Sequence, residues 1–201
     1  IEYFEKSLKR LGVKSIYALM MHRDTDLFNK NAYVVYEVIK KLKREKKINK
    51  FGISIYNTDS LAVLMEKFKI DLIQAPVNVI DRRLENSGWL NRLKQANVEI
   101  HTRSAFLQGL LLLPLDRIPR YFDKWMPLFK QWHQFLYDND VTALDACLSY
   151  PLSLGNVKNV IVGVQTRQEL NQILEVEMKK FNIDTSFMSC EEQGLINPAY
   201  W

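Results

Sequence analysis

The chain has 201 residues, of which 47% are hydrophobic and 25% are charged, and its net charge is +5. This length and apolar content suffice for one sizeable core, so we expect a single globular domain over residues 1–201. The two cysteines, Cys147 and Cys190, have no metal-ligand or disulfide-framework spacing, so we predict no metal site. No run of about 18 apolar residues and no signal peptide pattern is present. We therefore predict a cytoplasmic protein without a membrane partner.

The densest basic run is KKLKREKK at residues 40–47. It follows a helical pattern in which Val38, Ile39 and Leu42 are the apolar positions. A solvated helix face is the first interpretation, and a site for an anionic ligand or nucleic acid is the second. Because the other lysines and arginines are dispersed, we expect no nucleic-acid partner.

In the first half of the chain, apolar spacing predicts a helix over residues 2–11 that ends at Gly12, followed by a strand over 15–22. A second helix is predicted over 30–47 with Val34, Val35, Val38, Ile39 and Leu42 facing inward, and a second strand over 50–56. A helix over 59–69 and a strand over 71–77 continue this alternation.

In the second half, a helix is predicted over 89–95 and a strand over 99–106. Two helical segments follow over 121–139 and 144–154, and aromatic residues at helical spacing, Trp125 and Trp132 among them, are expected in the core. A last strand is predicted over 159–164 and a last helix over 167–177. Five strands that alternate with helices require parallel pairing through right-handed crossovers, and hence an α/β fold.

Two α/β architectures fit this order of elements: an open doubly wound sheet and a closed eight-stranded barrel. The doubly wound fold with a dinucleotide usually has a glycine-rich first turn, whereas this chain has 7 glycines and no such motif. A barrel instead gathers polar residues at the carboxyl ends of its strands. Residues of this kind close four successive predicted strands: His22, Ser54, Asn57, Gln74, Asn78, Arg103 and Ser104.

Taken one at a time, these residues also have structural explanations. Ser54 and Asn57 can cap the next helix, Gln74 can satisfy buried backbone, and a strand-end histidine is often structural. His101 and His133 lack paired ligand spacing and are expected to be structural as well. The joint placement of polar residues at four strand ends favours a barrel rim that surrounds a common pocket.

Five segments come in the order and spacing of one known family. They are SLKRLGVKSIYALMMH, INKFGISIYN, DLIQAPVN, RSAFLQGLL and VIVGVQTRQEL. In them the chain resembles the aldo-keto reductases, from about residue 5 to residue 176. The resemblance implies a (β/α)8 TIM barrel, here an incomplete barrel of about five parallel strands with interleaved helices. It also implies a nicotinamide cofactor bound without a glycine-rich loop.

The resemblance places His22 at the family's catalytic histidine, with the role of orienting the substrate carbonyl. Ser54 and Gln74 match residues that hold the nicotinamide carboxamide, while Ile55 stands where many members have asparagine. Arg103, followed by Ser104, lies where many members stack a tyrosine on the nicotinamide ring. The segment after the last strand matches the adenosine phosphate loop, with Gly163, Gln165, Thr166 and Gln172 nearest to the pattern.

The family most often uses NADPH, so the resemblance implies NADP(H) in preference to NAD(H). The position often filled by an arginine that binds the 2′-phosphate is Glu169 in this chain, although Arg167 is close by in sequence. A carboxylate at that position disfavours a phosphate.

The resemblance implies NAD(P)H-dependent reduction of an aldehyde or ketone, including a sugar carbonyl, by hydride transfer. The family's aspartate, tyrosine and lysine fall before the matched part. Since the chain also does not begin with methionine, we expect a fragment of a longer reading frame that is inactive alone. The alternative is a non-catalytic nucleotide-binding or regulatory barrel. Arg23, Arg82, Arg83 and Arg103 indicate either an anionic substrate group or ordinary surface charge. We make no prediction of an oligomeric state.

Overall fold

The computed structural model describes residues 1–176 and 184–201, which fall into two compact units. Unit 1 comprises Ile1–Ala75 and Asn91–Ile100, and unit 2 comprises Pro76–Leu90 and His101–Trp201. Within the described residues, no helix combines the length and the apolar character needed to cross a membrane.

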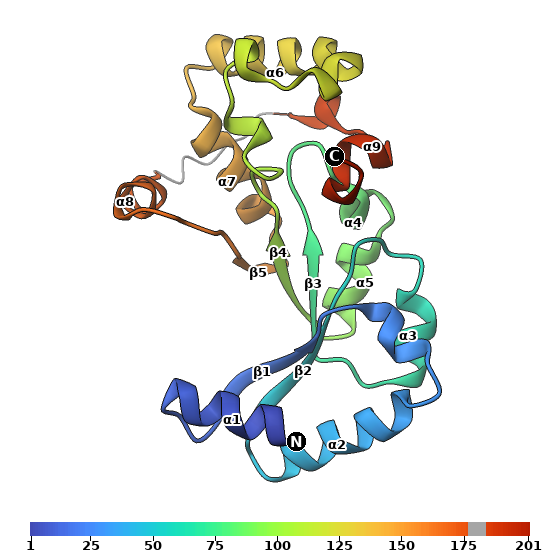
Figure 1. Cartoon of the computed structure of the whole chain (residues 1–201). Helices are drawn as coiled ribbons and strands as arrows, with labels where there is room; N and C mark the ends of the chain where they lie inside the picture. The colour runs from blue at the N-terminus through green and yellow to red at the C-terminus, as the bar shows by residue number, and fades with distance from the viewer. Residues whose placement is uncertain (177–183) are drawn as a thin grey trace. The chain divides into compact units, whose positions relative to one another are not determined.

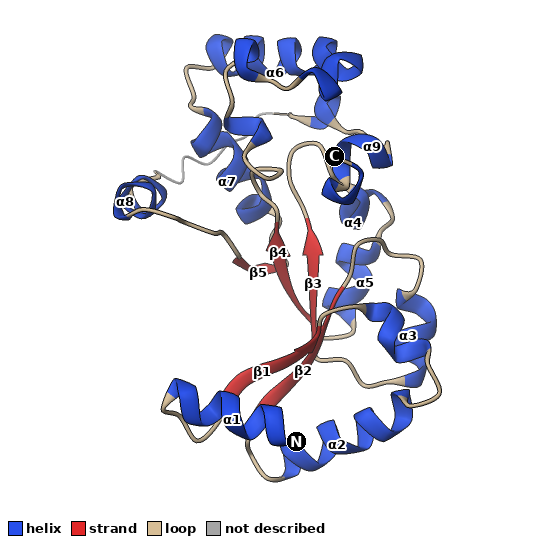
Figure 2. Ribbon diagram, in the orientation of Figure 1, coloured by secondary structure: helices blue, strands red, loops and turns tan. Residues whose placement is uncertain are grey.

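Five parallel strands belong to one sheet in the order β1-β2-β3-β4-β5, and Figure 2 shows them in red. Their bounds are Ile16–Met21, Ile48–Ser54, Leu72–Pro76, Glu99–Arg103 and Val157–Val160. The order of the strands in the sheet equals their order in the chain. This is the arrangement predicted for successive strand-helix crossovers, so the predicted α/β class is confirmed.

The α-helices alternate with these strands (Figure 1). The α-helices are α1 (Glu2–Leu11), α2 (Ala32–Arg44), α3 (Leu61–Lys67), α4 (Arg83–Asn86), α5 (Trp89–Gln95), α6 (Met126–Asp138), α7 (Ala143–Ser153), α8 (Arg167–Leu174) and α9 (Gln193–Ile196). Short 3-10 helices cover Asp24–Phe28, Leu110–Leu112, Leu115–Arg117, Arg120–Trp125, Ser186–Met188 and Pro198–Tyr200. Every predicted helix has a counterpart in this series. The end predicted for the last helix, Glu177, lies outside the described residues.

Several predicted boundaries are wrong, for local reasons. Helix α2 ends at Arg44 rather than at residue 47, because Lys46 adopts a left-handed φ of 56° before β2 begins. Strand β4 ends at Arg103 rather than at residue 106, because Ser104 also has a left-handed φ, of 61°. The predicted strand over 159–164 is displaced: β5 spans Val157–Val160, and Ile161 donates its N–H to Thr102 near the end of β4.

In unit 1, β1, β2 and β3 pair in parallel, and Met20 is level with Gly52 and Gly52 with Leu72. Glycine is required at position 52, since a Cβ there would meet the side chains of Met20 and Leu72 at 3.0 Å. Helix α2 buries Ala32, Ile39 and Leu42. The prediction that Val34 faces inward is wrong, since it is 66% exposed. Val34 is rotated by about 140° from Ile39 around the helix.

In unit 2, two helices owe their positions to identifiable contacts. Trp132 of α6 is fully buried and donates its indole N–H to the Leu111 carbonyl oxygen at 3.1 Å, so its predicted core position is confirmed. Trp125 is only half-buried, against Phe122. Helix α7 begins at Thr142, whose hydroxyl accepts a hydrogen bond from the Asp145 N–H.

Gly12, at the end of α1 in unit 1, has the left-handed φ of 68° expected of a helix C-cap.

Candidate functional site

Three predicted site residues of unit 1 lie at the carboxyl ends of adjacent strands. Ser54 ends β2 and is level with Gln74 of β3, and His22 directly follows Met21, which is level with Ile53. His22 and Ser54 therefore continue the same row as Gln74. Ser54 and Gln74 are two residues beyond Gly52 and Leu72, and side chains two residues apart share a face of a strand. The sheet thus brings Ser54 and Gln74 onto one edge and one face, and His22 follows the end of the adjacent strand β1.

The row differs in exposure from one strand to the next. The His22 side chain is exposed, Gln74 is half-buried and Ser54 is buried at 9% exposure. The Gln74 carbonyl oxygen accepts the Ile55 N–H at 2.9 Å, which fixes the backbone at the end of β2. After β1, the Asp24 carboxylate accepts a hydrogen bond from the Ser60 hydroxyl. That bond joins the loops that follow β1 and β2, and it gives Asp24, two residues after His22, a structural role.

Asn57 and Asn78, which also follow strands, have structural roles. The Asn57 side-chain oxygen accepts the Asp59 N–H at 3.2 Å. In unit 2, the fully buried Asn78 accepts the N–H groups of Ile80 and Asp81 and donates to the Ser104 carbonyl oxygen at 3.0 Å. Asn78 therefore ties the loop after β3 to the end of β4. The sequence placed Asn78 at a strand end, but it carried no signal for this cross-strand bond.

Arg103 and Ser104 close β4 in unit 2. The Arg103 carbonyl oxygen accepts the Val77 N–H at 3.1 Å, and one guanidinium nitrogen lies 3.3 Å from the Ser104 hydroxyl. Both side chains are half-buried. The left-handed backbone of Ser104 turns the chain sharply at this point, so the two residues lie on the loop at the carboxyl end of the strand.

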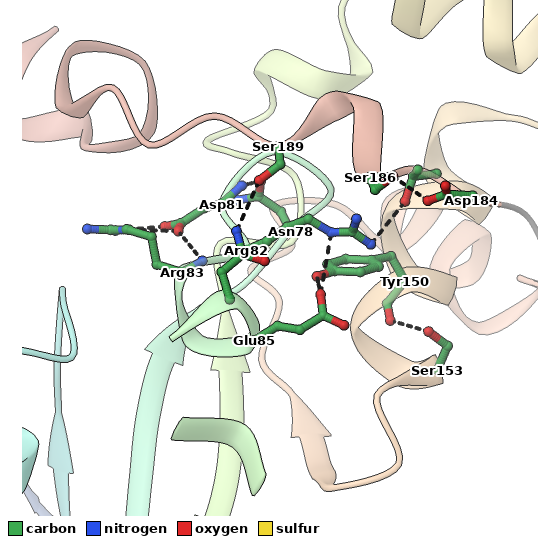
Figure 3. Close-up of polar contacts among 12 residues, drawn as sticks. Asn78, Asp81, Arg82, Arg83, Glu85, Tyr150, Ser153, Asp184, Ser186 and Ser189 are labelled. Carbon is green, nitrogen blue, oxygen red and sulfur yellow. Dashed lines mark hydrogen bonds and ion pairs between the residues drawn. The ribbon is translucent and has the colours of Figure 1, made fainter. Parts of the chain in front are cut away.

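Arg82 and Arg83 have partners within unit 2 (Figure 3). Asp81, 1% exposed, accepts two hydrogen bonds from the Arg83 guanidinium, each of 2.8 Å. The Arg82 guanidinium lies 4.4 Å from the centre of the Tyr150 ring and 3.6 Å from the Glu85 carboxylate. Both arginines are therefore built into the fold, which favours structural charge over an anionic substrate site at these two positions.

Tyr150 donates its hydroxyl to Glu85 at 2.8 Å. Burial, and next the hydrogen bond to Glu85, raise the pKa of the Tyr150 phenol. Burial likewise raises the pKa of the Cys147 thiol. Raised pKa values keep both groups protonated at neutral pH, which suits a structural tyrosine and an unreactive thiol.

The predicted adenosine phosphate loop follows β5 and leads into α8. Thr166 is the N-cap residue of α8, and its hydroxyl accepts the Glu169 N–H at 3.1 Å. The Glu169 carboxylate accepts the Gln165 N–H at 2.7 Å. The carboxylate therefore occupies the amino end of α8, where the helix dipole and free N–H groups favour negative charge.

A pocket of about 520 Å³ lies beside α8 in unit 2. We call it the acidic pocket, and define it by Thr142, Asp145, Gly163, Glu169, Gln172 and Glu175. Two predicted residues, Gly163 and Gln172, line it, whereas Gln165 and Thr166 do not. Three of its lining residues are carboxylates, and among the described residues that line it there is no lysine or arginine. Thr142-x-x-Asp145 and Thr166-x-x-Glu169 are capping-box patterns, the sequence signal that could have placed these acids at helix ends.

In the part of the chain that the structure describes, no group of three or more His, Cys, Asp or Glu could hold a metal ion. His101 has its Nε2 atom 2.9 Å from the Asn159 amide nitrogen, and His133 has Nε2 3.1 Å from the Leu113 carbonyl oxygen. These contacts give both histidines structural partners.

The sequence matches the model of the Aldo/keto reductase family over residues 1–191. It is 24% identical to the NADH-specific methylglyoxal reductase of Escherichia coli (strain K12) over 182 residues, which cover 83% of this chain and 55% of that protein. The holo structure of aldo-keto reductase AKR11C1 from Bacillus halodurans superposes with a TM-score of 0.73 at 21% identity, over 87% of this chain and 57% of that one. The thermostable aldo-keto reductase Tm1743, solved with the inhibitor epalrestat, gives a TM-score of 0.70 at 18% identity, over 93% and 63%.

The chain spans little more than half the length of the first of these relatives. The solved structures show its fold, which covers part of a (β/α)8 barrel. The roles of the nine predicted site residues remain predictions.

Proposed function

Since the chain belongs to the aldo/keto reductase family, whose members use nicotinamide cofactors, we propose that it serves the NAD(P)H-dependent reduction of a small aldehyde or ketone. The observation that carries this proposal is the row of His22, Ser54 and Gln74 at the ends of three adjacent parallel strands. A barrel enzyme binds its substrate at this edge. A sugar carbonyl is one substrate of the proposed class.

The residues of the row fit a nicotinamide. The Gln74 side chain offers one amide oxygen and one NH₂ group, and the Ser54 hydroxyl both donates and accepts, so together they complement a carboxamide. When bound, the nicotinamide supplies the hydride. The exposed imidazole of His22 would donate a hydrogen bond to the carbonyl oxygen and orient the substrate. In unit 2, we propose Arg103 and Ser104 at the end of β4 as further cofactor-binding residues.

For the adenosine part of the cofactor, we propose that the binding residues lie in the acidic pocket and in the loop that carries Gln165 and Thr166. The sequence favoured NADP(H), but the three carboxylates of the pocket would repel a 2′-phosphate. The Glu169 carboxylate also already occupies the amino end of α8. We therefore propose that the chain prefers NAD(H). The Escherichia coli relative, whose name describes it as NADH-specific, is consistent with this choice.

A cofactor-binding role without turnover is the second candidate for these 201 residues. The residues that match the family favour this second role. They include His22 and the cofactor positions, but no counterpart of the family's catalytic aspartate, tyrosine and lysine. We propose that the chain by itself binds cofactor and does not reduce a carbonyl. We also propose that units 1 and 2 belong to one domain in a cytoplasmic protein, because the family match runs through both.

Calorimetric titration with NADH and NADPH tests the proposal. We expect NADH to bind more tightly than NADPH, and Gln74→Leu to weaken NADH binding by about tenfold, because two hydrogen bonds to the carboxamide are lost. Gln131→Leu, at an exposed position on α6, is the control. Equal NADH affinity in the wild type and the Gln74 variant would contradict the proposed site. NADH oxidation in the presence of methylglyoxal by the 201-residue chain would contradict the claim of binding without turnover.

A further inference from the structure

A second pocket, of about 260 Å³, lies in unit 1 between α2 and the start of β2. We call it the basic pocket, and define it by Tyr36, Ile39, Lys40, Lys43, Arg44, Phe51 and Lys69. Five of these residues come from α2, where they recur every three to four positions and so form one face of the helix. The proposed reductase site does not use any of them. Three of them, Lys40, Lys43 and Arg44, belong to the basic run at 40–47, for which the sequence allowed either a solvated helix face or an anion site.

The inner wall of the basic pocket is aromatic and held in place. Phe51 is completely buried, and its ring centre lies 5.9 Å from that of Tyr36. Tyr36 also packs edge-on against Phe68 at 5.1 Å, and its hydroxyl accepts the Lys69 N–H at 2.9 Å. These contacts hold the Tyr36 ring in place, and the Lys40 ammonium lies 5.4 Å from the ring centre, so ring and cation line the pocket together.

Four cationic side chains line this wall, and two of them already have acidic partners. Lys43 forms an ion pair with Asp71 at 2.6 Å, and Lys40 forms one with Glu37. Asp71 also accepts the Phe51 N–H at 2.8 Å, so Lys43 is held by a fixed carboxylate. Arg44 and Lys69 are exposed and have no ion pair or side-chain hydrogen bond to any other described residue. Asp71 and Glu37 thus offset the charges of Lys43 and Lys40, and the charges of Arg44 and Lys69 remain.

We propose that the basic pocket binds a small anion with a flat apolar body, such as an aryl phosphate. A guanidinium and an ammonium beside one pocket are suited to phosphate, and an aromatic wall is suited to a ring. The volume is sufficient, because a cavity of about 150 Å³ already accommodates benzene and the pocket is larger by roughly the space of an anionic group. A bare inorganic anion would leave the Tyr36 ring without contact, and a neutral ring would leave Arg44 and Lys69 without an anionic partner.

The test is a titration of the full ¹⁵N-labelled chain with phenyl phosphate, followed by NMR. The Lys69 amide is a built-in reporter, because it donates to the Tyr36 hydroxyl at the wall of the pocket. We expect this amide to shift with saturation, and inorganic phosphate and benzyl alcohol to bind at least tenfold more weakly. Inorganic phosphate that binds as tightly as phenyl phosphate would overturn the role of the aromatic wall. A Lys69 amide that does not move at millimolar phenyl phosphate would overturn the site.

Charge-removing variants test the role of the two unpaired cations. Arg44→Gln and Lys69→Gln remove exposed charges and leave the wall intact, so both variants should fold. Each should weaken phenyl phosphate binding by roughly two- to fivefold, and the double variant by about tenfold. Lys67→Gln is the matched control, since it removes the same charge two residues from Lys69 without lining the pocket. If Lys67→Gln weakens binding as much as Lys69→Gln, the attraction is general surface charge and the proposal is wrong.

Discussion

The acidic pocket of unit 2 and the basic pocket of unit 1 differ in charge, and part of the difference follows from the helix ends that line them. The acidic pocket is lined by Asp145 and Glu169, each in the first turn of its helix, where a carboxylate satisfies free N–H groups. The basic pocket is lined by Lys43 and Arg44, both in the last turn of α2, where cations are favoured. Helix-end chemistry thus accounts for these four charges, whereas Glu175, at the C-cap of α8, and Lys69, outside α2, add to each pocket independently of it.

The largest expected effect is on stability, and it comes from Phe51 in the inner wall of the basic pocket. Phe51→Ala should lower the free energy of unfolding by about 3–5 kcal/mol, because it removes a completely buried ring from between α2 and the sheet. Urea denaturation measures the loss. Phe106→Ala, at a half-buried residue that lines the acidic pocket, is the comparison and should cost less. An equal or larger loss for Phe106→Ala would show that the acidic pocket, rather than the basic one, is built on the core.

Asp71→Asn should separate stability from binding in the basic pocket. The change weakens the contact with Lys43, while the amide oxygen can still accept the Phe51 N–H, so we expect a loss of about 1 kcal/mol. Phenyl phosphate should bind about two- to fivefold more tightly, because Lys43 loses its competing carboxylate. Asp26→Asn is the charge-matched control at an exposed position. Weaker phenyl phosphate binding in Asp71→Asn would contradict this account of the pocket's charge.

Thr142→Ala should lower the free energy of unfolding by about 1 kcal/mol, because the N-cap bond to the Asp145 N–H is lost. Thr142→Ser keeps the hydroxyl and should restore most of the stability. Thermal unfolding followed by circular dichroism compares the three proteins. A serine variant as unstable as the alanine variant would mean that the methyl group of Thr142, rather than its hydroxyl, stabilises α7.

The smallest expected effect is on the pH dependence of stability. Because the fold raises the pKa of Tyr150 above its ordinary value of 10.0, the folded chain keeps a proton that the unfolded chain releases. This stabilisation is complete below pH 10 and is lost as the pH rises through the folded-state pKa. Urea denaturation at pH 9 and pH 11 should show a steeper loss in the wild type than in Tyr150→Phe. A steeper loss in Tyr150→Phe would reverse the sign of the argument.

The sequence predicted the elements well and the local geometry less well. Periodicity located β1 to β4 to within a few residues at their ends, and it predicted a fifth strand that only overlaps β5. It misplaced β5, because a strand ends where its neighbour ends, and Ser104 ends β4 through a left-handed φ that the residue type does not reveal. The row of His22, Ser54 and Gln74 could be predicted from strand ends. The fixed position of Arg82 could not, because its partner Tyr150 is brought to it by packing of a distant segment, whereas Glu85 and Asp81 are local partners of Arg82 and Arg83.

The most direct test of the account is an NMR titration of the labelled chain with NADH, followed by phenyl phosphate in the same sample. We expect NADH to shift the amides of Ile55, Gln165 and Glu169, and phenyl phosphate then to shift Lys69 without reversing the first set. Two separate sets would support a nicotinamide site at the strand ends and an independent anion site beside α2. NADH that shifts Lys69 and leaves Ile55 and Gln165 unmoved would contradict the proposed cofactor site.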